Sequence, residues 1–293
     1  MKYLDNLKVK ATECKDWFDL AKSSKKKRAI LLYDIEKPLL EDYRKYNSKV
    51  RSYRSKFSQS KLKDNYTVLL DFYNKPPSNL DSLICDRRHN HGLNECPFCG
   101  KPVSPGTLDH FIPKNSWPEY SILQNNLVPQ CKECAPIKGD DYHSDNGHAI
   151  FLNPIFSKLL SFVEFKIKIE FNEEVKSINF LPKIVIPNNL SKKDQRRILS
   201  HFKALKIKSR IIKYSARTMK RWENALKASD FDISAALQTR IDERSDEERC
   251  RDWKSSLYTS VLKHHEYMQY LNSLKGVNAK PKRKIRKKVE LDI

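Results

Sequence analysis

The sequence predicts an α+β protein that is mainly helical, with one turn-rich block and one β-hairpin after it. Five of the six glycines fall between residues 92 and 147, which concentrates tight turns in one block. Apolar residues elsewhere recur at helical spacing. One stretch near residue 165 alternates apolar and charged side chains, which is typical of a strand. We therefore expect four regions: basic helices over 1–90, the turn-rich block over 91–150, a hairpin and helices over 151–275, and a basic tail over 276–293.

The first region carries a long stripe of apolar and aromatic side chains. Pro38 suits the first turn of a helix. The stripe follows at steps of four and three residues and consists of Leu39, Tyr43, Tyr46, Val50, Tyr53 and Phe57. Basic residues lie between them, namely Arg44, Lys45, Lys49, Arg51, Arg54 and Lys56. Such a helix buries its tyrosines against neighbours, and its other face is free to follow DNA phosphates.

The third region begins with strand-like alternation and continues with helices. Phe165, Ile167, Ile169 and Phe171 share one face of a predicted strand, and a second strand around 177–186 completes a hairpin. Ser191 is a suitable N-cap for a helix over 191–228, in which apolar residues repeat every seven positions. Another helix is expected over about 247–274, packed against the first.

Charge and composition narrow the classes of function. The chain has 293 residues, with 57 Lys and Arg against 36 Asp and Glu, so its net charge is +21. This excess favours a polyanionic partner, and we expect DNA. The six glycines form neither GxGxxG nor GxxxxGK, which argues against dinucleotide-binding and P-loop enzymes. No apolar run has the length of a membrane span and no signal core is present, so we expect a cytoplasmic protein without a membrane partner.

Four of the seven cysteines form two CxxC pairs. They are Cys96, Cys99, Cys131 and Cys134, with 31 residues between the pairs. Each CxxC turn presents two thiolates, and two such turns complete the tetrahedral shell of a zinc ion. Because four cysteines leave no open coordination position, the predicted Zn²⁺ is structural. Cys14, Cys85 and Cys250 are scattered, and we interpret them as packing residues.

Between the two pairs stand adjacent acidic and imidazole side chains. Asp109 can bind a hard divalent cation, and His110 can take a proton from water. These groups are the ones that phosphodiester hydrolysis requires. Basic residues expected to bind nucleic acid are Lys114 and Lys138 nearby and, in the tail, Lys282, Arg283, Lys284, Arg286, Lys287 and Lys288.

The order of these motifs resembles the zinc-bearing HNH endonucleases. It runs from the first CxxC through Leu108-Asp109-His110-Phe111-Ile112-Pro113-Lys114, Asn126-Leu127-Val128-Pro129-Gln130 and the second CxxC to Lys138-Gly139-Asp140. The resemblance covers roughly residues 93–142. The following Phe151-Leu152-Asn153-Pro154 is similar to the continuation in the HNH subunit of Septu-type bacterial anti-phage systems, which work with a separate ATPase.

The resemblance implies a ββα-metal core and a role for each residue. The first strand would carry Asp109 and His110, a loop would run from residue 113 to 124, the second strand would lie near 127–130, and a helix would start at Cys131. His110 would be the general base, and Asp109 would hold a catalytic Mg²⁺ or Mn²⁺. Asn126 would orient His110 by a hydrogen bond.

One position departs from the family pattern. The residue after the last cysteine is usually a metal-binding His or Asn, but here it is Ala135, which cannot bind a metal. Three explanations remain open: another ligand from among Asp140, Asp141, His143 and His148, with His143 the one we name; an inactive site; or an alanine substituted to prevent cleavage. We expect a DNA endonuclease. The alternatives are an inactive zinc-dependent nucleic-acid-binding protein and an RNA-cleaving HNH enzyme.

Overall fold

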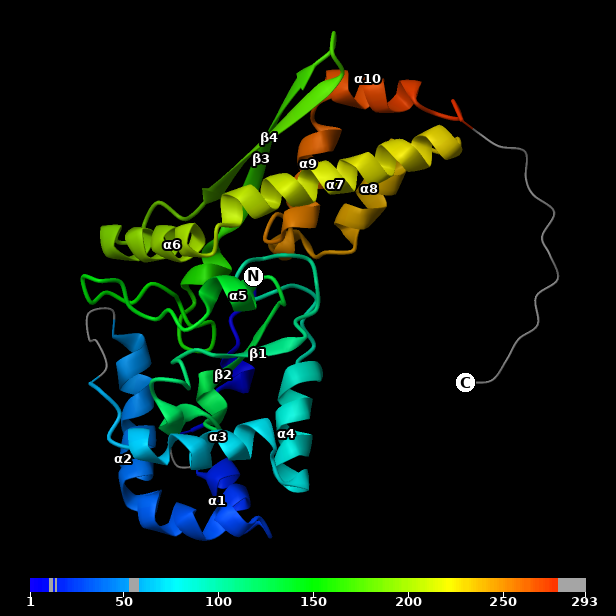
Figure 1. The fold of residues 1–293 in the computed structure, drawn as a ribbon. Coiled ribbons are helices and arrows are strands. Elements are labelled where there is room, and N and C mark those ends of the chain that lie inside the picture. Colours follow the sequence, from blue (N-terminus) through cyan, green and yellow to red (C-terminus); the bar gives the residue numbers. More distant parts are fainter. Residues whose placement is uncertain (11–12, 14, 53–57, 279–293) are drawn as a thin grey trace, which may run out of the picture.

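A computed structural model of the chain describes residues 1–10, 13, 15–52 and 58–278 (Figure 1). Helices dominate it, and its described strands form two separate antiparallel pairs. The predicted α+β class is therefore confirmed at this level. In Figure 1 the N-terminal helices lie at one end, the C-terminal helices and the long hairpin lie at the other, and β1, β2 and α5 lie between them.

The N-terminal end consists of α1 (Asp16–Lys22), α2 (Leu31–Arg51), α3 (Tyr66–Asn74) and α4 (Ser78–His89). Leu39, Tyr43, Tyr46 and Val50 are buried along α2, as the stripe predicts. The last part of the stripe, residues 53–57, lies outside the described residues.

The predicted start of this helix at Pro38 is wrong. α2 begins seven residues earlier at Leu31, and Pro38 lies inside it. Proline removes one backbone hydrogen bond from a helix interior. Leu32 and Ile35 are buried on the N-terminal side of Pro38, so apolar burial holds the extra turns in place.

The turn-rich block contains β1 (Thr107–His110), β2 (Leu127–Gln130) and α5 (Cys134–Lys138). β1 and β2 pair in antiparallel register, with Thr107 opposite Gln130 and His110 opposite Leu127. Both strands lie where the resemblance implied them. The helix starts three residues later than expected, because Cys131–Cys134 form a turn in which the Cys134 amide donates to the Cys131 carbonyl at 3.0 Å.

The predicted hairpin consists of β3 (Glu164–Asn172) and β4 (Ser177–Val185). Phe165, Ile167 and Ile169 are buried on one face, which is the face the alternation indicates. β3 contacts α9 and β4 contacts α7, so the hairpin packs on the C-terminal helices.

Those helices are α6 (Lys192–Ala204), α7 (Ile207–Ala228), α8 (Ile233–Asp242), α9 (Trp253–Leu262) and α10 (His265–Ser273). The Ser191 side chain caps α6 by accepting from the Asp194 amide, as predicted. The predicted single helix over 191–228 breaks at Leu205 and Lys206, where Lys206 has a φ of 54°. The seven-residue spacing continues across the break because Leu205 is still buried.

The predicted helix over 247–274 is likewise divided into α9 and α10, and the sequence analysis missed α8. α7 contacts both α9 and α10, in agreement with the expected packing.

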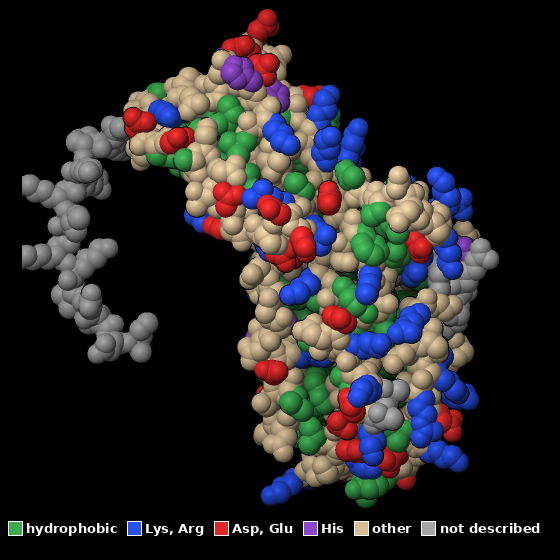
Figure 2. Space-filling model, turned by 180° about the vertical axis from the view of Figure 1, so that it is seen from behind, with side chains coloured by type: hydrophobic (Ala, Val, Ile, Leu, Met, Phe, Trp, Pro, Cys, Tyr) green, Lys and Arg blue, Asp and Glu red, His purple; other side chains and the backbone are tan. Residues whose placement is uncertain are grey.

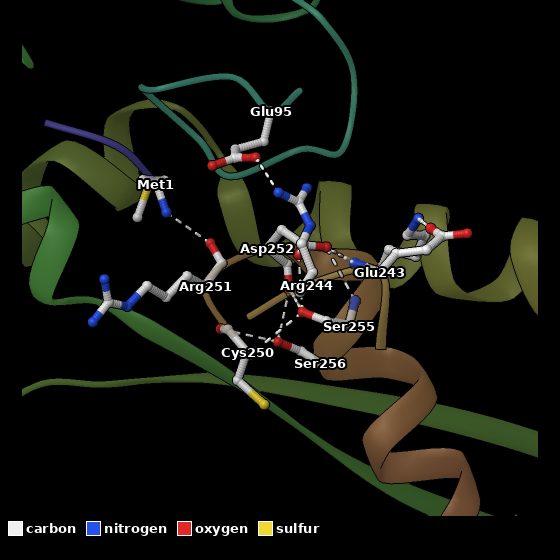
Figure 3. A network of polar contacts seen from close by, with 10 residues as sticks. Met1, Glu95, Glu243, Arg244, Cys250, Arg251, Asp252, Ser255 and Ser256 are labelled. Atoms are coloured by element: carbon white, nitrogen blue, oxygen red, sulfur yellow. Dashed lines mark hydrogen bonds and ion pairs between the residues drawn. The ribbon is translucent and has the colours of Figure 1, made fainter. Parts of the chain in front are cut away.

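A polar network joins these helices to the turn-rich block (Figure 3). Arg244 lies with Nη1 2.9 Å from Glu95 Oε2 and with Nε 3.4 Å from Asp252 Oδ2. The Met1 amino group donates to the Arg251 carbonyl at 2.9 Å. Three parts of the chain that are far apart in sequence therefore meet at one place, which fixes the C-terminal helices relative to the first CxxC loop.

Among the described residues, no helix combines the length and the apolar character needed to cross a membrane.

Candidate metal centre and active site

The four predicted cysteines converge on one point. Cys96 and Cys99 come from the loop before β1, Cys131 follows β2, and Cys134 begins α5. All four are buried, and their Sγ atoms lie within 4.8 Å of one another. Zn–S bonds of ~2.3 Å in a tetrahedron place sulfurs ~3.8 Å apart, and the Sγ atoms of Cys99 and Cys131 are 3.9 Å apart. The cluster could hold a structural metal ion such as zinc.

Local turns position the first pair of thiols. The amides of Cys99 and Gly100 donate to the Cys96 carbonyl at 3.3 and 2.8 Å. Gly100 has a φ of 72°, and a Cβ at this position would lie 2.6 Å from the Phe165 ring. Only glycine therefore fits between this turn and the hairpin.

Arg210 of α7 completes the surroundings of the cluster. Its Nη1 lies 3.3 Å from Cys134 Sγ, and its Nη2 lies 3.7 Å from the Sγ atoms of Cys99 and Cys131. Hydrogen bonds from the neighbouring cysteines lower the pKa of Cys131, whereas burial raises the pKa of Cys96 and Cys99. The guanidinium offsets the negative charge that metal-bound thiolates carry. The sequence analysis missed Arg210, because nothing in a helix 76 residues beyond Cys134 marks this contact.

His201 of α6 was also missed, and it braces the first cysteine turn. Its Nε2 lies 2.7 Å from the Phe98 carbonyl, and its Nδ1 accepts from the Leu152 amide at 3.2 Å. Burial lowers the pKa of His201 to about 4, so the ring is neutral at physiological pH. The Trp253 indole donates to the Cys99 carbonyl at 2.7 Å, which fixes the same turn from α9.

The carboxylate of Asp109 lies at the other end of the strand pair and is closed off from solvent. Its Oδ1 is 3.2 Å from Lys138 Nζ. Its Oδ2 is buried without a hydrogen-bond partner among the described residues. Burial raises the pKa of Asp109, and the Lys138 ammonium opposes that shift.

The prediction that Lys138 binds nucleic acid is contradicted by its position. Its side chain is 0% exposed and lies between the rings of Phe111 and Phe151. Its Nζ also donates to the His110 carbonyl at 3.4 Å. The pairing with Asp109 compensates for burying the ammonium, which has no route to a phosphate on the surface.

His110 is held in one tautomer. Its Nε2 lies 3.0 Å from the Ser121 carbonyl, and because a carbonyl only accepts, the proton is on Nε2. Nδ1 therefore carries the lone pair. Tyr73 of α3 packs edge-on against the ring at 4.3 Å. Burial, together with Lys114, lowers the pKa of His110 to about 3, so the imidazole is neutral over the physiological range.

Asn126 does not have the role expected from the resemblance. Its Oδ1 accepts from the Tyr46 hydroxyl at 2.8 Å and from the Ile112 amide at 2.7 Å. Its Nδ2 donates to the carbonyls of Ile112 and Tyr120, each at 3.0 Å. The amide thus makes its hydrogen bonds to the loop between the strands and to α2, and the Ser121 carbonyl is what orients His110.

The other proposed ligands do not build a second metal group. The Asp140 carboxylate accepts from the Asn115 amide at 2.7 Å. His143 pairs in a bridge with Ala149 and packs its ring on Tyr142. In the part of the chain that the structure describes, the four cysteines are the only group of three or more His, Cys, Asp or Glu side chains placed to hold a metal.

Among the described residues, Asp109 alone does not make a site that fits Mg²⁺ or Mn²⁺, and Ala135, the residue after Cys134, offers no ligand atom.

Lys114 remains close to the centre. Its Nζ lies 4.6 Å above the Tyr73 ring, which itself contacts His110. Burial lowers the pKa of Lys114, and Asp140 opposes that shift. The six predicted tail residues, from Lys282 to Lys288, lie outside the described residues.

Comparison with known proteins yields one partial relative. The chain is 34% identical over 118 residues to Protein ea31 of Escherichia phage lambda. The match spans 40% of this chain and 39% of that protein, which is well under two thirds of its length. No family model matches the chain. No solved structure matches it either.

Proposed function

We propose that the chain is an HNH-type endonuclease that hydrolyses phosphodiester bonds in DNA. The observation that carries the proposal is the tautomer of His110. Its Nε2–H is tied to the Ser121 carbonyl, so its Nδ1 is a neutral base. Asp109 stands next to it on β1, and the two cysteine turns hold the strand pair.

In this proposal His110 does the proton transfer. Its Nδ1 accepts a proton from water as the water oxygen forms a bond to phosphorus, and the bond from phosphorus to the leaving oxygen breaks. The leaving oxygen then takes a proton from solvent. Lys114 supplies positive charge near His110 for the phosphate. We assign no step to a divalent cation, because the described residues do not fit one.

A second candidate function has its own support. Ala135 offers no ligand, and the Lys138 ammonium already pairs with Asp109, which favours a protein that binds nucleic acid without cutting it. The cysteine cluster would then serve only the fold. Cleavage of RNA by the same centre is a third possibility, which matched RNA and DNA substrates separate.

A nicking assay on supercoiled plasmid tests these candidates. The zinc-loaded chain would be compared with His110→Ala and Ala135→Asn, with Mg²⁺, Mn²⁺ or neither. The proposal is supported if the unchanged chain cuts the plasmid and the His110→Ala variant does not. Cutting only by Ala135→Asn supports an HNH centre that lacks one ligand.

Binding without cutting by every variant supports the second candidate. The resemblance alone suggests the anti-phage role and an ATPase partner, and the assay would be repeated with that partner if one copurifies.

A further inference from the structure

A hollow of about 540 Å³ lies between α7 and the cysteine block, outside the Asp109–His110 centre. One wall is a face of α7 that carries Arg210, Lys213, Arg217 and Arg221 at steps of three, four and four residues. Residues at these steps share one side of a helix. At 1.5 Å per residue, this row of cations is ~16 Å long.

The opposite wall is formed by the metal-binding unit. Lys101 follows the first CxxC turn, Lys132 lies within the second, and Pro136 and Ile137 come from α5. Lys138, the next residue of α5, contacts Asp109. One short helix therefore supplies side chains both to the hollow and to the proposed catalytic centre.

The charge in this basic groove is unbalanced. Glu133 is its one acidic lining residue, and it already pairs with Lys101 and with Arg210. Lys213, Arg217 and Arg221 are exposed, and no acidic partner is described for any of them. Like charges four residues apart destabilise a helix. A polyanion in the groove would remove that repulsion.

We propose that the basic groove binds the sugar-phosphate backbone of a nucleic acid. Phosphates of one strand advance ~3.4 Å per nucleotide along the axis of a duplex, so a row of cations ~16 Å long can contact several of them. Of the two aromatic lining residues, Trp253 is fully buried and Tyr214 is half-buried with its ring packed against Trp253, so charged side chains dominate the open surface. The site therefore recognises phosphate charge. This inference rests on the proposed function and names where its substrate lies.

The test measures binding separately from cutting. Anisotropy of a fluorescein-labelled 30-base-pair duplex would be followed with the zinc-loaded His110→Ala protein, at 50 to 200 mM salt. The groove variant carries Lys213→Glu, Arg217→Glu and Arg221→Glu. The salt slope is the change of log Kd with log salt concentration, and loss of three phosphate contacts lowers it by ~2.7. Between 50 and 200 mM salt, the Kd of the groove variant should therefore rise ~40-fold less than the Kd of the parent. The groove variant also binds more weakly at 50 mM salt.

A matched control is needed because Lys and Arg side chains also spread over the rest of the surface (Figure 2). Lys25→Glu, Lys27→Glu and Lys63→Glu change the net charge equally, on exposed residues of the N-terminal region that are not part of the predicted DNA-facing side of α2. We expect this control to keep the parent's slope.

The proposal would be overturned if the two triple variants lost salt slope and affinity equally, or if neither variant lost any. Competition by polyglutamate as strong as by unlabelled DNA would overturn it in favour of an acidic protein. Groove-dependent binding by a chain that never cuts supports the groove and removes the proposed function. If the chain cuts DNA but the groove variant binds DNA as well as the parent, the proposed function is supported and the groove is not the binding site.

Discussion

The cysteine cluster and the Asp109–His110 centre lie at opposite ends of the same strand pair. Thr107 and Gln130 pair next to Cys131, whereas His110 pairs with Leu127 at the far end. The cluster has four ligands within reach of one metal ion. The centre has the one carboxylate of Asp109, and the residue after Cys134 is Ala135, which has no ligand atom. The cysteine cluster therefore has a complete set of metal ligands, whereas the centre proposed for catalysis does not.

The two sites also balance their charge differently. Arg210 approaches the thiols from α7, and its side chain still borders a hollow on the surface. Lys138 approaches Asp109 from α5 and has no exposed surface. A buried ammonium paired with a buried carboxylate serves the fold, unless a ligand can displace the ammonium from the carboxylate. Comparing the loss of each site shows which of them the fold needs.

The largest effect is expected at the cluster. Cys131→Ser removes one of four ligands, and structural zinc contributes about 10–16 kcal/mol to folding in zinc-finger peptides. That is as large as the whole stability of an ordinary domain, about 5–15 kcal/mol. We expect loss of bound zinc and of the cooperative unfolding transition, measured by metal analysis and thermal circular dichroism. Cys85→Ser, outside the cluster, is the control and should melt like the parent. A folded, zinc-loaded Cys131→Ser protein would contradict the site.

The second largest effect on the free energy of unfolding is expected at the Asp109–His110 centre. Lys138→Met leaves Asp109 buried without its partner, which costs about 3–5 kcal/mol. Asp109→Asn alone leaves the ammonium unpaired and should cost a similar amount. The double variant leaves neither charge and should be more stable than the sum of the two losses predicts. Urea denaturation measures all four proteins. Additive losses would show that the pair is open to solvent, and the contrast with the cluster would then disappear.

The sequence predicted the cluster better than the centre for a physical reason. CxxC spacing is local, so two turns define the direction of all four thiols once the strands pair. The partners of Asp109 and His110 are instead set by packing. The Lys138 ammonium lies inside the protein, near the rings of Phe111 and Phe151. The Ser121 carbonyl reaches His110 from the loop that Asn126 holds.

The same distinction separates the helices from their ends. A stripe of apolar residues marks which face of α2 is buried. Such a stripe does not show that α2 starts before Pro38 or that the helix breaks at Lys206. Buried side chains continue on both sides of each of these two positions. Arg210 and His201 could not be found because their contacts with Cys134 and Phe98 are made across 76 and 103 residues.

The smallest effect on the free energy of unfolding is expected from two histidines, His201 near the cysteine cluster and His110 at the far end of the strand pair. Burial lowers the pKa of His201 to about 4 and that of His110 to about 3, against ~6.5 in the unfolded chain. The unfolded state therefore binds more protons between these values and pH 6.5. Stability is complete above pH 6.5 and falls by about 1.4 kcal/mol per pH unit for each ring as the pH drops below it.

His201→Gln removes one of these two steps. It is less stable than the parent at pH 7, and the difference should narrow by about 1.4 kcal/mol for each pH unit below 6.5, measured by urea denaturation. His110→Gln should behave alike. Nuclear magnetic resonance follows the rings directly, and neither should titrate between pH 8 and pH 5. A His110 ring that titrates near pH 6.5 while His201 does not would mean that solvent reaches His110 but not His201. That outcome would strengthen the nuclease proposal, because an imidazole with a pKa near the working pH is the more effective general base.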